Sequence, residues 1–156
     1  MENFTRLIVI CALLSLNITA SAEDESVVPS ADDWYKSEYA PLYLDNPWDR
    51  LDELMEHFTE SMHIHGGDSG DEVVNGREWL GGALQEWKIE GWLRSEIAEF
   101  DSDQLTPHAV TFKVKWRDYY SGGNVGYECG WYLANLKDDK WMITGYATIS
   151  CSDHGM

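Results

Sequence analysis

The sequence predicts an α+β domain in which helices near the N-terminus pack on a layer of antiparallel strands. Apolar residues recur at helical spacing in two segments before residue 90, whereas apolar and polar residues alternate with period two in most of the chain after Gly91. Clusters of Gly, Asn, Asp and Ser separate the alternating segments and indicate hairpin turns. Helices followed by a run of such strands are typical of an α+β layer.

The first 22 residues have the features of a secretory signal peptide. Arg6 precedes an apolar run from Leu7 to Leu16, and the small side chains of Ala20 and Ala22 suit the signal peptidase. The apolar run is too short to span a bilayer as a permanent anchor. We therefore expect cleavage after Ala22 and a periplasmic or secreted mature chain, with an uncleaved N-terminal anchor as the alternative.

Removing these 22 of the 156 residues leaves 134, which is the usual size of one domain. The removed segment carries one acidic and one basic side chain, so the formal net charge stays at −17. Nucleic acids and anionic membranes are bound mainly through Lys and Arg, and such a chain repels them. We expect neither as a partner, and solubility explains the acidity without a dedicated cation-binding surface.

Residues 23–33 are acidic, contain Pro29 and have little to bury, so we expect a flexible leader before a domain that spans residues 34–156. The aromatic residues between Trp34 and Tyr43 predict one short helix that stops before Pro41.

The clearest helical pattern runs from about Pro47 to Ser61. Asn46 suits the N-cap and Pro47 the first helical position. The apolar residues that follow at helical spacing are Leu51, Leu54, Met55, Phe58 and Met62.

A short strand over residues 62–65 and a glycine-rich loop over residues 66–71 come next. Asn75 predicts the cap of a second helix, from about Gly76 to Lys88. The residues that share its apolar face are Trp79, Leu80, Ala83, Leu84 and Trp87.

Four strands are predicted after Gly91, at Arg94–Phe100, His108–Tyr119, Gly126–Leu136 and Trp141–Ser150. Turns are expected at residues 101–103, 121–124 and 137–140. The second strand alternates most regularly. Its apolar face consists of Val110, Phe112, Val114 and Trp116, and its basic face of Lys113, Lys115 and Arg117.

The register of the last hairpin follows from its apolar residues. A three-residue loop over residues 138–140 places Trp131 opposite Ala147 and gathers the apolar side chains of both strands, Trp141 and Ile143 among them, on one face. A two-residue loop would divide these side chains between the two faces.

Two cysteines remain after Cys11 leaves with the signal peptide. In the preferred register Cys129 and Cys151 are diagonal neighbours on adjacent strands. An even number of cysteines in an exported chain favours a disulfide, and two unpaired buried thiols are the alternative.

The order of these segments resembles a known family. The resemblance depends on the helix with Leu51 and Phe58, the strand MHIHG, and the segments NGREWLGGALQEW, GWLRSEI, HAVTFKVKW and GWYLANLKDDKWMITGYA. From about Trp34 to Cys151, the chain is similar to the nuclear-transport-factor-2-like superfamily and specifically to its SnoaL-like branch.

The resemblance implies a cystatin-like α+β roll, in which a strongly curved antiparallel sheet packs on N-terminal helices and forms a cone with a pocket open at one end. Its members include isomerases, dehydratases, polyketide cyclases and many proteins with no known activity. The resemblance therefore implies a fold and does not by itself assign an activity.

Dehydratase and cyclase members use paired His, Asp and Tyr groups inside the cone as general acids and bases. Here the resemblance implies His65, Asp118 and Tyr132 as the catalytic candidates. In the isomerase members a carboxylate base follows the first short strand, where this chain has Gly66, with His65 and Asp68 nearby.

The ligand-binding candidates are Tyr39, His63, Trp116 and Tyr132. The chain has eight Trp and eight Tyr, and most of these rings are needed to fill a core, yet a lined pocket would use them too.

His63 and His65 alternate with apolar residues and should share one face of a strand. An HxH pair binds a metal only with a further ligand, for which His108, Asp68 and Asp71 are the candidates. We expect ordinary hydrogen-bonded histidines and no metal. The chain has no GxSxG elbow, P-loop or dinucleotide fingerprint, so we expect no cofactor.

Three functions stay open on the sequence. The first is binding of a small, partly apolar molecule in the cone, and the second is cofactor-free isomerisation, dehydration or cyclisation by proton transfer. The third is an interaction module that forms a homodimer through the exposed face of the sheet, with a pocket filled by its own side chains.

Overall fold

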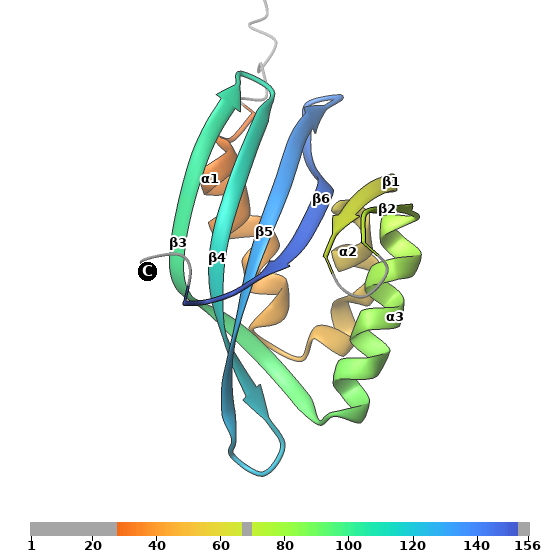
Figure 1. Ribbon diagram of the computed structural model, residues 1–156, viewed down its shortest axis with the longest axis vertical. Helices are drawn as coiled ribbons and strands as arrows, with labels where there is room; N and C mark the ends of the chain where they lie inside the picture. The colour runs from red at the N-terminus through yellow and green to blue at the C-terminus, as the bar shows by residue number, and fades with distance from the viewer. Residues whose placement is uncertain (1–27, 67–69, 153–156) are drawn as a thin grey trace, which may run out of the picture.

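The computed structural model describes residues 28–66 and 70–152, which form short N-terminal helices, one longer helix and a six-stranded sheet (Figure 1). The predicted signal peptide, its cleavage site and residues 23–27 of the expected leader lie outside the described residues. No helix within the described ranges is long and apolar enough to cross a membrane.

The sheet is mixed, curved and unclosed. Its strands are β1 (Phe58–His65), β2 (Glu72–Val74), β3 (Trp92–Thr106), β4 (Ala109–Tyr120), β5 (Val125–Lys137) and β6 (Lys140–Ile149), in the spatial order β2-β1-β6-β5-β4-β3. The predicted α+β architecture is confirmed. One detail is corrected, because β1 runs parallel to β6 while all the other neighbours are antiparallel.

Residues 31–43 form one continuous helical segment of changing pitch: α1 (Ala31–Trp34), a π-helical turn η1 (Tyr35–Tyr39) and a 3-10 turn η2 (Ala40–Tyr43). The expected stop before Pro41 is wrong. Pro41 lies in the first turn of η2, where its missing N–H costs little.

The ordered domain also begins before Trp34. Ala31 is buried, Ser30 caps α1 by accepting a hydrogen bond from the Asp33 N–H at 3.1 Å, and the Pro29 carbonyl accepts one from Trp141 Nε1 at 3.0 Å. The C-terminal part of the segment expected to be a flexible leader is therefore attached to β6.

The helix predicted from Pro47 to Ser61 is wrong in its second half. A 3-10 turn, η3 (Pro47–Arg50), leads into α2 (Leu51–Glu56), and the chain enters β1 at Phe58. Phe58 and Met62 are four residues apart, which fits one face of a helix and equally one face of a strand, and both are buried from β1. The pairing of this segment with β6 selects the strand.

The two predicted helix caps have different outcomes. Asn75 is confirmed as the cap of α3 (Gly76–Ile89), since its Oδ1 accepts hydrogen bonds from the backbone N–H groups of Arg77 and Glu78 at 3.1 and 3.2 Å. Asn46 instead has a left-handed backbone, with φ of 41°, and its side-chain amide donates to the Asp49 carboxylate.

The turn expected at residues 101–103 is also wrong, because β3 continues through this segment and pairs with β4. Asp101 faces Lys113 and Asp103 faces Thr111, so the polar residues that suggested a turn lie on a ladder whose partner strand is basic. The chain reverses at residues 107–108 instead.

The alternation of β4 is confirmed. Val110, Phe112, Val114 and Trp116 are all buried on the concave face of the sheet. On the opposite face, Lys115 pairs with Glu99 at 2.6 Å and Arg117 with Glu96 at 3.0 Å.

The β5–β6 hairpin reaches the predicted pairing of Trp131 with Ala147 by a different route. Its loop has two residues, Asp138 and Asp139, both with positive φ, and Lys137 faces Lys140. A bulge after Ile143 then shifts the register by one residue. The expectation that Trp141 and Ile143 share the Trp131 face is therefore wrong, because the two-residue loop places Trp141 opposite Leu136 and Ile143 opposite Ala134 before the bulge is reached.

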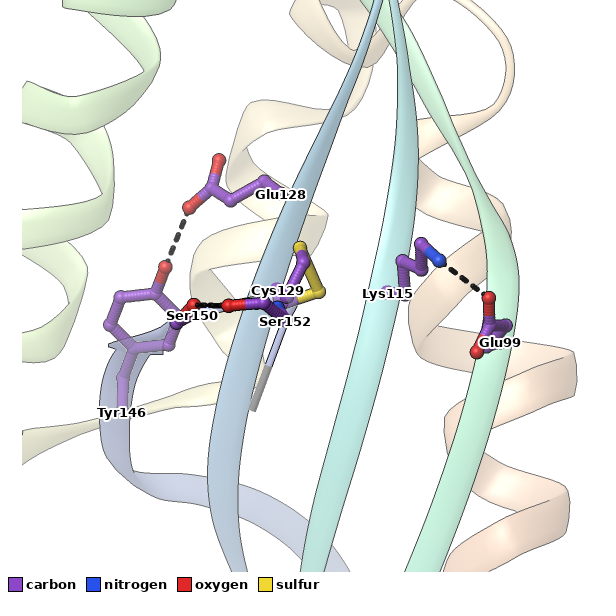
Figure 2. The surroundings of a disulfide bond; sticks show 8 residues. Glu99, Lys115, Glu128, Cys129, Tyr146, Ser150 and Ser152 are labelled. Atoms are coloured by element: carbon purple, nitrogen blue, oxygen red, sulfur yellow. Dashed lines mark hydrogen bonds and ion pairs between the residues drawn. A yellow bond between two sulfur atoms is a disulfide. The ribbon is translucent and has the colours of Figure 1, made fainter. Parts of the chain in front are cut away.

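The predicted disulfide is present between Cys129 of β5 and Cys151, with a Cα–Cα distance of 5.3 Å, and connects the chain end to the sheet (Figure 2). This distance is shorter than that of an ordinary diagonal pair, because Cys151 lies beyond the end of β6 at Ile149 and is not held by the ladder.

Candidate functional site

A cavity of about 30 Å³ lies between α3, the η1–η2 segment and the concave face of the sheet. Its walls are mostly aromatic, with two carboxylates among them. The lining residues are Tyr39, Tyr43, Phe58, Trp79, Leu80, Trp87, Trp92, Ser95, Trp116, Asp118, Tyr120, Glu128, Tyr132 and Tyr146. This volume holds one or two waters.

Helix α3 contributes one wall, and a glycine fixes each of its ends. The Cα of Gly76 packs so closely on β1 that an added Cβ would lie 2.7 Å from the Thr59 carbonyl oxygen. Gly91, with φ of +85°, ends the helix and accepts a hydrogen bond from the Ser121 N–H at 2.7 Å. The rings of Trp79 and Trp87 are thereby directed at the sheet, where they approach Tyr146 and Trp92 with centroid distances of 5.0 and 5.4 Å.

Gly130 allows the Tyr132 ring to lie along β5. A Cβ at residue 130 would lie only 2.8 Å from Cε2 of that ring, so any other residue would displace it. In its observed position the Tyr132 hydroxyl accepts a hydrogen bond from Trp116 Nε1 at 2.9 Å. This pair forms one side of the cavity.

Asp118 is the more deeply buried of the two carboxylates. Ser95 Oγ donates to its Oδ1 at 2.5 Å, and Trp92 Nε1 donates to Ser95 Oγ at 2.8 Å. These three residues lie on β3 and β4, where Ser95 directly faces Asp118 in the ladder. Burial raises the pKa of Asp118, and the hydrogen bonds from Ser95 and Trp92 reduce the rise.

Glu128 projects from β5 towards the hydroxyl of Tyr146, which donates a 2.8 Å hydrogen bond to Oε1 (Figure 2). Burial raises the pKa of Glu128, the Tyr146 hydrogen bond opposes the rise, and the charges of Asp118 and Glu90 add to it. The two carboxyls of the cavity are therefore coupled.

The tyrosines stay protonated at any physiological pH. Burial raises the pKa of Tyr39, Tyr43, Tyr132 and Tyr146 far above the usual range. The hydroxyls of Tyr39 and Tyr43 share a hydrogen bond of 2.9 Å. These groups can donate and accept hydrogen bonds but do not act as phenolate bases.

Solved structures share this architecture. A protein described as a candidate polyketide cyclase from Xanthomonas campestris has 15% sequence identity, with 74% of this chain and 86% of that chain covered and a TM-score of 0.50. A Nostoc punctiforme protein of unknown function with a cystatin-like fold has 13% identity, coverage of 69% and 79%, and a TM-score of 0.53. An uncharacterised cystatin-like protein from Caulobacter vibrioides has 10% identity, coverage of 72% and 83%, and a TM-score of 0.50. The chain has a cystatin-like fold.

The cystatin-like fold is the one implied by the resemblance to the nuclear-transport-factor-2-like superfamily, which is thereby confirmed at the level of the fold. Identities of 15% or less show the fold alone. No family model and no curated protein matches the sequence.

Four of the residues selected from the sequence lie together in the cavity of this cystatin-like fold: Tyr39, Trp116, Asp118 and Tyr132. The two histidines do not. His63 and His65 lie on β1 with exposed, stacked rings whose centroids are 6.5 Å apart, and neither lines the cavity. Their shared face is confirmed, but it is directed away from the buried Met62.

The histidine pair also has no metal set around it in the described residues, where no group of three or more metal-binding side chains occurs. His65 Nδ1 lies 2.8 Å from Asp71 Oδ1, and both side chains are largely exposed. Asp68, another proposed ligand, lies outside the described residues.

Sequence reasoning missed Glu128, Tyr146 and the tryptophans of α3 and β3. Glu128 could have been found, because it shares the even-numbered face of β5 with Tyr132. The apolar Trp131 and Leu133 made the odd-numbered face look like the buried one.

A second, wider groove of about 520 Å³ lies near α1, α2 and the β5–β6 turn. It contains His57, whose pKa is lowered by burial, together with Glu38, Glu56, Arg77 and Lys140. These four charged side chains are exposed, and none of them forms a hydrogen bond with His57 in the described residues. The buried, hydrogen-bonded cavity is therefore the better candidate site.

Proposed function

We propose that this chain is an exported protein that binds a small, partly apolar molecule in its cone-shaped cavity. One observation carries the proposal: the buried carboxylate of Asp118, the partly buried carboxylate of Glu128 and several tyrosine hydroxyls converge on a cavity that is otherwise walled mainly by Trp, Tyr, Phe and Leu side chains. Apolar walls with a few placed polar groups are the usual composition of a small-molecule site. The Cys129–Cys151 disulfide supports export, since such bonds persist in oxidising compartments.

The size of the cavity sets what can enter. At about 30 Å³ it accepts one or two waters without rearrangement. Trp79 and Trp87 are only partly buried and belong to α3, whereas Trp92 and Trp116 are held in the sheet. We expect a larger ligand to displace the two α3 rings outwards and to leave the sheet rings in place.

The indole N–H signals of the eight tryptophans provide a test by nuclear magnetic resonance. Three small probes are tert-butanol, phenol and trimethylammonium chloride, each of which is larger than the unaltered cavity and requires the α3 rings to move. Binding of any of them in the cavity should shift the signals of Trp92 and Trp116 in a saturable way and leave those of Trp131 and Trp141 unchanged. If none of the three probes does so at millimolar concentration, or if all eight signals move together, the proposal fails.

A second function, cofactor-free proton transfer, is favoured by the raised pKa values of both carboxyls. An acid whose pKa is moved towards neutrality exchanges protons more effectively at physiological pH. In this version Asp118 and Glu128 take the role that the sequence suggested for His65, and Tyr146 and Tyr132 donate hydrogen bonds to the substrate.

Exchange of the α-protons of cyclohexanone in deuterated water would reveal such activity. Catalysis predicts that the wild-type chain exceeds the buffer rate and that Glu128→Gln removes the excess, whereas Glu99→Gln, on the other face of the sheet, retains it. An exchange rate equal to that of buffer would rule out this chemistry on simple ketones and leave the binding function.

The interaction module remains the third proposal. The convex face of the sheet carries the half-exposed Tyr127 and Val125 beside ion-paired side chains. A homodimer through this face predicts twice the monomer mass in light scattering, and conversion to monomer by Tyr127→Lys. The monomer mass for the unaltered chain would exclude it.

A further inference from the structure

Within residues 28–66 and 70–152, the two carboxylates of the cavity have no cationic partner. Among the described residues, every Lys, Arg or His in an ion pair is matched with another acid, and none with Asp118 or Glu128. Asp118 is only 5% exposed, and of its two oxygens only Oδ1 accepts a hydrogen bond from a side chain in these ranges. Buried carboxylates are normally paired or bound to a cation, so this arrangement is unusual.

The walls around these carboxylates consist largely of aromatic rings, whose faces are electron-rich. Tyr43 lies 5.3 Å from Trp116 and 6.3 Å from Trp92 between ring centroids, and Trp92 lies 5.4 Å from Trp87, so these four rings form one contiguous wall. Such rings attract an organic cation placed within about 6 Å of a centroid, and Trp does so most strongly.

A metal ion fits the same walls poorly. Ca²⁺ needs about six to eight oxygen ligands, and Mg²⁺ keeps several of its waters. The described residues offer no group of three or more metal-binding side chains here, and indole rings do not replace water ligands. The composition of the cavity therefore favours a cation that is itself apolar on its surface.

We propose that the cavity recognises the charged head group of a small organic cation, a methylated ammonium, with Asp118 and Glu128 as its anionic partners and the Trp and Tyr rings as its walls. This inference depends on the proposed binding function and narrows its ligand class. The cavity of about 30 Å³ is smaller than such a head group, so we expect Trp79 and Trp87 of α3 to move outwards when the cation binds. The net charge of −17 raises the local concentration of any cation near the surface.

Trimethylammonium and tert-butanol form a matched pair of probes, because their shapes are similar and only the first is charged. Titration at neutral pH, followed through the indole signals of Trp92 and Trp116, should give a dissociation constant about tenfold or more lower for trimethylammonium. Glu128→Gln should weaken trimethylammonium about tenfold and change tert-butanol by less than about twofold.

Glu99→Gln is the matched control, because that carboxylate pairs with Lys115 on the opposite face of the sheet. It should change neither dissociation constant. If the Glu128→Gln chain does not fold, as judged by its spectrum, Asp118→Asn provides the same comparison with Asp101→Asn as its control.

Equal affinities for the two probes, or equal losses in Glu128→Gln and Glu99→Gln, would overturn the cation assignment and leave the binding function in place. If trimethylammonium, tert-butanol and phenol all leave the indole signals of Trp92 and Trp116 unchanged, both the cation assignment and the binding function fail.

Discussion

Replacing Gly130 with alanine tests the packing that shapes the cavity. The new Cβ would lie 2.8 Å from Cε2 and 3.0 Å from the hydroxyl oxygen of Tyr132, whereas ordinary contacts begin at 3.4 Å. The Tyr132 ring is buried and cannot turn into solvent. We therefore expect it to shift and to lose its hydrogen bond with Trp116.

Three contributions set the expected change in the unfolding free energy of Gly130→Ala. Overpacking of this kind costs about 1–3 kcal/mol of unfolding free energy, and the lost hydrogen bond costs about 1 kcal/mol. The alanine lowers the entropy of the unfolded chain, which returns about 0.4–1 kcal/mol because Gly130 is not among the residues with positive φ. The expected net loss is about 2 kcal/mol.

Urea denaturation of four chains measures this coupling: wild type, Gly130→Ala, Tyr132→Ala and the double variant. Without the ring, the added methyl meets no obstacle, so Gly130→Ala should cost nothing in the Tyr132→Ala background. Gly82→Ala is the control, since nothing lies within 4 Å of its Cβ in α3, and it should stabilise by about 0.5–1 kcal/mol. The reasoning is refuted if Gly130→Ala is as stable as wild type or costs the same with and without the Tyr132 ring.

Other predictions concern single groups. The Tyr35 hydroxyl is fully buried with no hydrogen-bond partner in the described residues, so Tyr35→Phe should raise the unfolding free energy by up to about 1 kcal/mol. Tyr39→Phe, which breaks a hydrogen bond with Tyr43, should lower it by a similar amount, and equal losses in the two variants would contradict this. The disulfide closes a separation of 22 residues, so replacing both cysteines with alanine should cost about 3 kcal/mol in urea denaturation by the chain-entropy relation. A cost below about 0.5 kcal/mol would contradict this prediction, and would indicate that residual contacts between the β5 and β6 segments already restrict the unfolded chain. Burial raises the pKa of Glu128 above its value in the unfolded chain, and the charges of Asp118 and Glu90 add to the rise, although the Tyr146 hydrogen bond opposes it. The folded chain therefore binds the Glu128 proton more tightly than the unfolded chain does. The free energy of unfolding falls as the pH rises from the unfolded pKa through the folded pKa of this group. Glu128→Gln should therefore be more stable than wild type at neutral pH, and the two chains should become equally stable below the pKa of Glu128 in the unfolded chain. If the difference in unfolding free energy does not change with pH, or grows as the pH falls, the raised pKa of Glu128 is wrong.

The sequence predicted the parts of the site in which side-chain polarity alone defines a face. On β4, apolar and polar residues alternate without exception from Val110 to Arg117, so the position of Asp118 on the same face as Trp116 followed from counting. The β5 strand offered no such contrast, because Trp131 and Leu133 on one face are as apolar as Tyr132 and Ala134 on the other. Glu128 was missed for this reason. The bulge after Ile143 was missed as well, because the alternation of apolar and polar residues does not show where a register shift occurs.

In the N-terminal half, prediction from the sequence was limited in a different way. Phe58 and Met62 fit a helix and a strand equally well, and only the pairing of β1 with β6, more than 80 residues later in the chain, selects the strand. The histidines of β1 alternate as predicted. Their outward direction, however, depends on which face of β1 meets the core, and the sequence of one short strand does not specify that.

Cation binding in the cavity can be seen in a crystal structure of the protein grown with trimethylammonium chloride. We expect density for the cation inside the cavity, in contact with the rings of Trp92 and Trp116 and with a carboxylate oxygen of Asp118 or Glu128. A cavity closed by its own side chains at saturating cation, or density only in the groove beside His57, would contradict it.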